Sequence, residues 1–308
     1  MAKIVFSLLV HERPLVILDQ INNILTFNPN STVAIHFNPK FSENDSLSKA
    51  ELINILKKIK GVVINPHPVD VSIDNLIQGH ISNYRCVEKE DFDYFYLIAS
   101  NELFICSGAE KFVENYDFGC EKLKNKKWYY YKKMIADDSM KQLLGESLEE
   151  RCFTSQVEGS FYSKDIFAHL ISSIERVFDY KNQSQIYPRE ESMFSTIACN
   201  DYPEAKRYNG CLCYINWKRG LFVSIKKMKK ATASNSYFSV KRVDRKIDNY
   251  LREYIRYYLT KSNSFFGEGI IPSRHHSLFS IHVKDLYWTF HFFVRSLFSC
   301  VKHKLLKR

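Results

Sequence analysis

Residues 3–37, KIVFSLLVHERPLVILDQINNILTFNPNSTVAIHF, decide the fold class of this 308-residue chain. Residues 3–10 form an apolar run typical of a buried strand, and residues 14–25 carry apolar side chains at helical spacing. Residues 31–37 form a second run that is rich in β-branched side chains. A strand, a helix and a strand in this order predict parallel pairing within a sheet that helices cover.

The alternation continues beyond this stretch. Residues 48–59 and 72–83 have helical patterns, and residues 61–64 and 94–99 read as strands. We therefore predict an α/β fold with a doubly wound, mostly parallel sheet. Ligands of such sheets bind beyond the carboxyl ends of the strands. The polar residues expected at those ends are His11, Glu12, His36, Asn38, Ser100, Asn101 and Glu102.

The remaining chain is less regular. Residues 106–150 are irregular and basic, and residues 218–246 are strongly basic. The patterns predict strands near 155–162 and 208–217, and helices over 163–178, from Glu190, over 248–259 and over 283–307. We divide the chain into one domain over residues 1–247 and a C-terminal helical extension over residues 248–308.

Composition narrows the class of partner. The chain has 44 Lys and Arg against 34 Asp and Glu, so its formal net charge is +10. That charge favours an anionic partner such as nucleic acid, an acidic membrane surface or a phosphorylated small molecule. The eight cysteines show no paired zinc spacing, and the N-terminus lacks a secretory pattern. We expect a cytoplasmic protein with reduced thiols and no structural metal.

Four segments, in this order along the chain, match a known pattern. They are the opening stretch continued to TVAIHFNPK (32–40), FDYFYLIASNELFI (92–105), SQVEGSFYSKDIFAHLI (155–171) and YPREESMFSTIACND (187–201). Together they resemble the core-2/I-branching N-acetylglucosaminyltransferase family over roughly residues 3–245. The resemblance implies a GT-A-like fold and an inverting transfer of a sugar from a nucleotide-sugar donor, with a UDP-sugar favoured.

Two motif positions depart from the family. Its I-H-V-D motif has Asn38 in place of the aspartate, and its G-x-D motif reads Ser100-Asn101-Glu102. The secretory-pathway members are rich in disulfides, unlike this chain. The chain therefore resembles a distant bacterial-type relative, and the implied acceptor is a glycan or glycolipid in surface polysaccharide synthesis.

The resemblance assigns catalytic candidates. It places Glu191 on the family's catalytic glutamate, which takes the proton of the acceptor hydroxyl. Glu190 and Glu191 follow Pro188 at an expected helix start, where acidic side chains are common for structural reasons alone. Glu158 lies in a strand-like segment before Gly159 and is the alternative base or an acceptor ligand. We expect Glu190 to contact the acceptor.

Donor-binding candidates come from the basic region. The family neutralises the donor diphosphate with Arg and Lys in place of a metal, and YFSVKRVD (237–244) is similar to its phosphate-binding segment. This implies Lys241 or Arg242 on the diphosphate, with Arg219 as a second cation and His11 near the nucleotide. For any single lysine of this region, a solvated basic face is the better explanation, and phosphate binding is a hypothesis about the cluster as a whole. Asp137-Asp138 does not follow a nucleotide-binding strand, so we predict no metal site and no cofactor.

Two further residues are acceptor candidates. Trp217 closes an expected strand and offers a flat apolar face to a sugar ring, although a buried core Trp is equally consistent with the pattern. Glu102 ends an expected strand, where it would hydrogen-bond sugar hydroxyls or serve as a cap or turn residue.

The C-terminal residues 284–308, KDLYWTFHFFVRSLFSCVKHKLLKR, are aromatic and end in a basic run. This pattern predicts an interfacial helix on anionic lipid, at the inner face of the cell membrane, and it also fits a helix packed on the domain or on a second subunit.

Two other functions compete. A nucleic-acid-binding protein would explain the charge and KLKNKKWYYYKK (122–133), although no recognition motif accompanies it. A catalytically inactive, GT-A-like carbohydrate-binding protein would explain Asn38.

Overall fold

The computed structural model describes residues 1–39, 41, 47–72, 75–178, 185–217, 223–260 and 276–305. Within these residues, seven strands form a central sheet in the order β3-β2-β1-β4-β7-β6-β8. They are β1 (Ile4–Val10), β2 (Thr32–Phe37), β3 (Val62–Ile64), β4 (Tyr94–Ile98), β6 (Phe118–Gly119), β7 (Phe161–Ser163) and β8 (Arg207–Tyr208). Strands β3, β2, β1 and β4 run parallel, and only β7 runs antiparallel to its neighbours.

A small three-stranded sheet adjoins the central one. It consists of β5 (Glu102–Phe104), β10 (Ser239–Lys241) and β9 (Cys213–Tyr214), in that order. Strand β10 pairs antiparallel with β5, with Lys241 opposite Glu102, and parallel with β9. This pairing brings the basic end of β10 to the edge where β4 ends.

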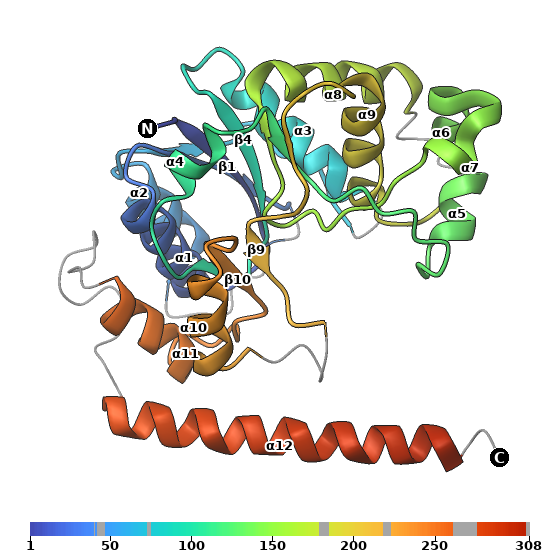
Figure 1. Cartoon of the computed structure of the whole chain (residues 1–308). Coiled ribbons are helices and arrows are strands. Elements are labelled where there is room, and N and C mark those ends of the chain that lie inside the picture. Colours follow the sequence, from blue (N-terminus) through green and yellow to red (C-terminus); the bar gives the residue numbers. More distant parts are fainter. Residues whose placement is uncertain are drawn as a thin grey trace.

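Helices cover both faces of the central sheet (Figure 1). The helical segments are α1 (Pro14–Phe27), α2 (Lys49–Leu56), α3 (Leu76–Val87), α4 (Ala109–Val113), α5 (Tyr131–Ala136), α6 (Asp138–Leu144), η1 (Gly145–Ser147), α7 (Leu148–Arg151), α8 (Lys164–Val177), η2 (Arg189–Glu191), α9 (Met193–Asp201), α10 (Ile225–Ala233), α11 (Tyr250–Tyr254), η4 (Ile255–Leu259) and α12 (Leu278–Leu305). Alternate β1 residues enter two cores: Phe6 packs with α1 and α2, and Val5 packs with α3, α8 and α9.

The predicted fold class is confirmed: the molecule is an α/β protein whose mostly parallel sheet is flanked by helices. Several predicted elements differ in extent. The strand expected near 155–162 begins only at Phe161, because Gly159 has a φ of 84° that an extended strand cannot contain. The Gly159 N–H donates a hydrogen bond to the Leu97 carbonyl, and the Gly159 carbonyl accepts one from the Leu212 N–H. These two bonds turn the chain between the two sheets.

Other boundaries also move. The helix expected from Glu190 begins as the 3₁₀ turn η2, and α9 starts only at Met193. The strand expected over 208–217 is divided into β8 and β9, which belong to different sheets. The C-terminal helix begins at Leu278, five residues earlier than predicted from the sequence.

The hydrophobic core continues past residue 247. Tyr250, Leu251 and Ile255 are buried in the same cluster as β1 and α1. On α1, the Asp19 carboxylate pairs with the guanidinium groups of Arg252 at 2.8 Å and Arg256 at 2.7 Å. The beginning of the predicted C-terminal extension is therefore packed as part of the main domain.

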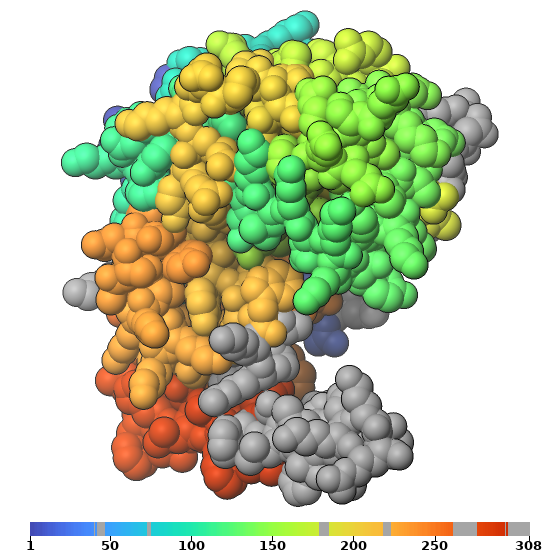
Figure 2. Space-filling view, turned by 45° about the vertical axis from the view of Figure 1, so that its right-hand side comes forward, coloured from blue at the N-terminus to red at the C-terminus, as the bar shows by residue number. Residues whose placement is uncertain are grey.

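Helix α12 lies along one edge of the molecule (Figure 1). Its described side chains pack against residues shown in orange in Figure 2, where Ile281 is buried and Asp285 accepts hydrogen bonds from the Ile225 N–H and the Tyr250 hydroxyl. No helix in the described ranges is both long enough and apolar enough to cross a bilayer.

Candidate active site

A cavity of about 220 Å³ lies at the carboxyl ends of β1 and β4, where the sequence predicted a ligand site. Its lining includes six side chains that were predicted from the sequence. These are His11, Glu158, Glu190, Glu191, Lys241 and Arg242. They come from four separate stretches of the chain, so the fold has brought them together.

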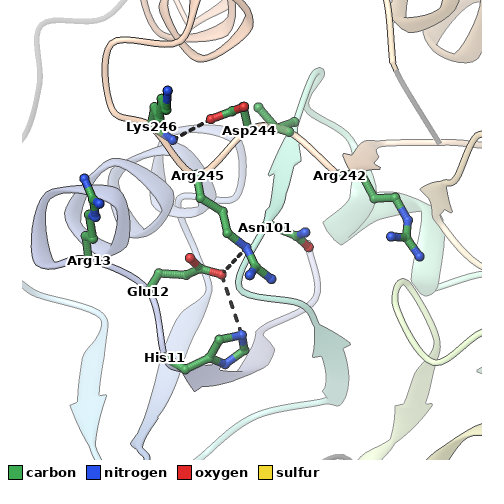
Figure 3. A pocket seen from close by; sticks show the side chains of 9 residues that line it. His11, Glu12, Arg13, Asn101, Arg242, Asp244, Arg245 and Lys246 are labelled. Atoms are coloured by element: carbon green, nitrogen blue, oxygen red, sulfur yellow. Dashed lines mark hydrogen bonds and ion pairs between the residues drawn. The ribbon is translucent and has the colours of Figure 1, made fainter. Parts of the chain in front are cut away.

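A larger cavity of about 720 Å³ adjoins the first (Figure 3). The two share His11, Asn101, Arg242 and Arg245 in their linings, so they form one continuous depression. Four cationic side chains line the larger cavity against two carboxylates: Arg13, Arg242, Arg245 and Lys246 against Glu12 and Asp244. An excess of guanidinium and ammonium groups is suited to a polyanion such as a diphosphate.

A buried glutamate, Glu12, lines the larger cavity. The Glu12 carboxylate accepts a hydrogen bond from the Ser100 hydroxyl at 3.0 Å. It also pairs with Arg245 Nε at 2.8 Å (Figure 3). His11 Nε2 lies 3.2 Å from the same hydroxyl. Burial lowers the pKa of His11, and the charges of Arg245 and Lys241 lower it further, against the opposing effect of Glu12. His11 is therefore neutral at pH 7 and offers a hydrogen bond in place of a charge.

Glu191 has the protonation behaviour of a general base. It ends the η2 turn, and burial raises its pKa to about 7. The charge of Glu158 also raises the pKa, whereas Lys241 and a hydrogen bond from the Trp128 side chain lower it. A carboxylate that titrates near the working pH can both take and release a proton efficiently.

Glu190 differs from its neighbour in burial. It is 6% exposed, and its Oε2 atom has no hydrogen-bond partner within the described part of the chain. Burial raises its pKa well above the ordinary range, and the charges of Glu191 and Glu158 add to this effect. The raised pKa favours the protonated form of Glu190, in which the carboxyl group can donate a hydrogen bond.

Glu158 and Lys241 form an ion pair at the cavity wall. Both side chains keep about a fifth of their surface exposed. Gly159 allows the close approach that holds Glu158 in place, because a Cβ atom there would lie 2.3 Å from the Cys213 backbone nitrogen. Lys241 is thus engaged by a carboxylate, and Arg242 is the adjacent cation that both cavities share.

Arg242 adopts a left-handed backbone conformation, with a φ of 72°. Non-glycine residues in this region cost free energy and cluster at functional sites. Its N–H donates to the Asn101 carbonyl at 3.2 Å, and its guanidinium carbon lies 5.9 Å from the centre of the Trp217 ring. Trp217 is 66% exposed, which excludes the alternative of a buried core tryptophan.

Among the predicted site residues that the structure describes, Trp217 and Glu102 are not in the lining of either cavity. Glu102 is fully buried, where its carboxylate accepts hydrogen bonds from Ser239, Tyr96 and the Ala99 N–H. It therefore has no surface to offer a sugar hydroxyl, and its role in this structure is to tie β5 to β10. Arg219 lies outside the described residues.

A buried ion pair that the sequence did not reveal supports the η2 turn. The Arg189 guanidinium contacts the Asp137 carboxylate, with Nε 3.1 Å from Oδ2, and both side chains are almost completely buried. The rings of Phe178 and Tyr187 lie 4.8 Å from the guanidinium carbon. Asp137, which does not belong to a metal-binding motif of the sequence, thus anchors Arg189, the residue that precedes Glu190.

Other cavity residues were also missed. Arg13, Arg245 and Lys246 line the larger cavity, and His80 lines the smaller one. Arg245 and Lys246 lie just beyond the segment that carried the phosphate prediction, and Arg13 follows the predicted His11-Glu12 pair, so adjacency was the available signal. His80 is in the middle of α3 and has no such signal.

Among the described side chains, no cluster of three or more His, Cys, Asp or Glu residues is arranged to hold a metal ion.

Comparisons with known proteins give little beyond this geometry. No family model matches the chain, and no curated protein sequence matches it significantly. Among solved structures, the chain is similar to the galactosyltransferase LgtC in complex with donor and acceptor sugar analogues, with 10% sequence identity and a TM-score of 0.38. That match covers 86% of this chain and 98% of the other. A similarity this low supports no functional inference, so function has to come from the site.

Proposed function

We propose that this protein is an inverting glycosyltransferase that transfers a sugar from a nucleotide-sugar donor, with a UDP-sugar favoured, to a glycan or glycolipid acceptor. One observation carries the proposal: a glutamate with a pKa of about 7 lies in a cavity that opens into a second cavity rich in cations. The first feature suits deprotonation of a hydroxyl group, and the second suits a diphosphate leaving group. The four segments similar to the core-2/I-branching family support the same assignment.

In the proposed reaction, Glu191 takes the proton of an acceptor hydroxyl as its oxygen forms a bond to the anomeric carbon. The bond between that carbon and the donor phosphate oxygen breaks, and the nucleoside diphosphate leaves with the electron pair. Arg242, Arg245 and Arg13 stabilise the charge that develops on it. The geometry leaves Lys241 to hold Glu158, so Arg242 is the preferred choice of the two cations that the sequence left open.

The proposal includes independence from divalent metals, with guanidinium groups in the role of the cation. Its test is transfer in the presence of EDTA. Unchanged rates with and without chelator are expected, and a rate that depends on added Mn²⁺ or Mg²⁺ would contradict this part.

Glu191→Gln tests the base. An amide cannot accept the proton, so we expect nucleotide release in a coupled assay to fall by at least a hundredfold, within the usual contribution of general bases of about 10²–10⁴. Exposed Glu204→Gln is the matched control and should leave the rate unchanged. Full activity of Glu191→Gln would refute the assignment and make Glu158 the next candidate.

Donor binding is tested separately from turnover. Binding of UDP or a UDP-sugar should raise the melting temperature, because a ligand that binds only the native state stabilises it. Binding without transfer to any acceptor would favour the inactive, carbohydrate-binding alternative. If no nucleotide and no nucleotide sugar binds, the proposed glycosyltransferase function is refuted.

We also propose that α12 rests on an anionic membrane surface, which would suit a lipid-linked acceptor at the inner face of the cell membrane. The buried side of the helix carries Ile281 and Asp285, and the other side exposes large apolar groups: Phe279, Val283, Leu286, Tyr287 and Phe290. The helix continues into a sequence rich in Lys, and basic residues attract acidic headgroups.

Flotation with phosphatidylglycerol vesicles tests this proposal. Replacing Leu286 and Phe290 with Glu should abolish association and leave the core intact, because both side chains are exposed. Tyr129→Glu, at an exposed aromatic residue elsewhere, is the control that should still float with the vesicles. Equal association of all variants would exclude the helix as the contact.

A further inference from the structure

A second cationic surface lies beside the glutamates and is separate from the cavity rich in arginine. Residues 122–133, KLKNKKWYYYKK, contain six lysines, four aromatic residues and no acidic residue. We call these residues the lysine–aromatic segment. All six lysines are exposed, and Tyr129 is 86% exposed. The segment belongs to the green part of the chain, which forms an extended area of the surface in Figure 2.

Backbone contacts fix the segment beside the catalytic residues. Leu123 exchanges two backbone hydrogen bonds with Thr154, of 3.1 and 2.9 Å, on the stretch of chain that leads to Glu158. At the other end of this contact, the Gln156 N–H donates to the Glu121 carboxylate at 3.0 Å. The segment therefore runs alongside the residues that carry one wall of the smaller cavity.

Trp128 joins the segment to the proposed base. Its side chain gives the hydrogen bond that lowers the pKa of Glu191, and its ring packs edge-on against Tyr187 at 6.2 Å between centroids. An acceptor whose hydroxyl reaches Glu191 would therefore have its neighbouring sugar units next to Trp128 and the residues around it. Aromatic faces of this kind pack against the C–H faces of sugar rings.

The charge of the segment is largely unneutralised. Within the described part of the chain, Lys126 alone among the six lysines forms an ion pair, with the exposed carboxylate of Glu149 at 3.5 Å. Lys122 and Lys124 lie over the Phe153 ring, at 4.7 and 5.9 Å. A run of exposed lysines in which, among the described residues, only Lys126 pairs with a carboxylate favours a ligand that carries several negative charges.

We propose that the lysine–aromatic segment binds an acidic acceptor glycan, one that bears carboxylate or phosphate groups along its chain. This inference rests on the proposed glycosyltransferase function and specifies its acceptor class. Because the larger cavity has its own excess of cations for the donor diphosphate, the lysines of the segment serve a different anion. Nucleic acid offers similar charges, but contact of the segment with a proposed catalytic glutamate favours a glycan.

The test uses the full-length protein and labelled oligogalacturonate as the acidic probe, with a labelled malto-oligosaccharide of equal length as the neutral one. Fluorescence anisotropy should show binding of the acidic probe that weakens with salt, and at least tenfold weaker binding of the neutral probe. A labelled oligo(dT) of equal charge is measured in parallel.

Matched charge variants localise the site. Replacing Lys124, Lys127 and Lys132 with Gln lowers the net charge by three, and so does replacing Lys226, Lys229 and Lys230 on α10, which are also exposed. The first variant should bind oligogalacturonate about tenfold more weakly, the sum of three modest charge contacts. The α10 variant should change binding less than twofold.

Three results would overturn the inference: equal weakening in both variants, preferential binding of oligo(dT) that depends on the segment, or no binding of the acidic probe. UDP-dependent thermal stabilisation is measured on the same samples. Its persistence alongside any of these results would leave the proposed function standing while the acidic acceptor is rejected. Its absence from the wild-type protein would count against the proposed function instead.

Discussion

Glu191→Gln should stabilise the folded protein at alkaline pH while it removes activity. Burial raises the pKa of Glu191 from 4.5 to about 7, so the folded state binds more protons than the unfolded state between these values. Stability therefore falls as pH rises from about 4.5 to about 7 and stays low above that range. A pKa raised from 4.5 to about 7 corresponds to about 3 kcal/mol, which is the cost of the buried charge at pH 8.

Gln carries no charge at any pH, so the variant avoids this cost. Urea unfolding at pH 8 should show the variant more stable by up to about 3 kcal/mol, which is roughly 1 M in the midpoint for an m-value of roughly 3 kcal/mol/M. At pH 3.5 the two proteins should unfold at nearly the same urea concentration, because Glu191 is then mostly protonated in both the folded and the unfolded state.

Glu149→Gln serves as the control, since that side chain is 60% exposed and its replacement should shift the midpoint equally little at both pH values. A Glu191→Gln protein that is no more stable at pH 8 than the wild type would refute the reasoning from burial. Stabilisation with full activity retained would mean that Glu191 is a buried carboxylate without a catalytic role.

Three further changes test the surroundings of the site. Arg242→Ala should weaken UDP binding by about tenfold to a hundredfold in calorimetry, the loss expected for charge-assisted hydrogen bonds; unchanged affinity would remove Arg242 from the donor site. Gly159→Ala should lower the free energy of unfolding, measured in urea, by about 3 kcal/mol or more, because strain at its φ of 84° adds to a backbone clash. Gly145 has a φ of 58° and lies in open space, so Gly145→Ala should lower the free energy of unfolding by only about 1 kcal/mol. Asp137→Ala should lower the free energy of unfolding by about 3–5 kcal/mol, because it leaves the Arg189 charge buried without its partner. A loss of stability below about 1 kcal/mol would contradict this account.

The sequence was most informative where the pattern is local. The parallel arrangement of β1 and β2 follows from the periodicity of residues 3–37, because buried strands and an intervening helix have characteristic lengths and apolar spacing. The polar residues after β1 were placed at the site for the same reason. His11 does line both cavities, because the carboxyl ends of parallel strands meet at one edge.

Contacts between residues far apart in the sequence limited the prediction of the other site residues. Glu102 was expected to reach a sugar because it follows β4, but β10 covers it after pairing with β5, and nothing local in the sequence predicts that partner 137 residues away. The Asp137–Arg189 pair spans 52 residues and is equally hidden. Asp137 and Arg189 can be recognised as an ion pair only in the folded structure, where both charges are buried together.

The choice between Lys241 and Arg242 shows an intermediate case. The sequence placed both near the phosphate but could not separate them. In the structure, Lys241 ends β10 and pairs with Glu158, and Arg242 leaves the strand through a left-handed turn toward both cavities. A change of backbone conformation between two adjacent residues thus separates their roles, and a sequence pattern does not reveal it.

The position of Lys241 also distinguishes the three glutamates. Its ion pair engages Glu158, and burial raises the pKa of Glu190 well above its ordinary range. Glu191, with a pKa of about 7, is therefore the carboxylate whose proton exchanges near neutral pH. Glu158→Gln should then preserve activity but move the rise of kcat/KM to lower pH, because it removes a charge that raises the pKa of Glu191 and releases Lys241, which lowers it. The pH–rate profiles of wild type and variant measure this shift. A Glu158→Gln protein that is inactive at every pH, with UDP binding intact, would instead make Glu158 the base.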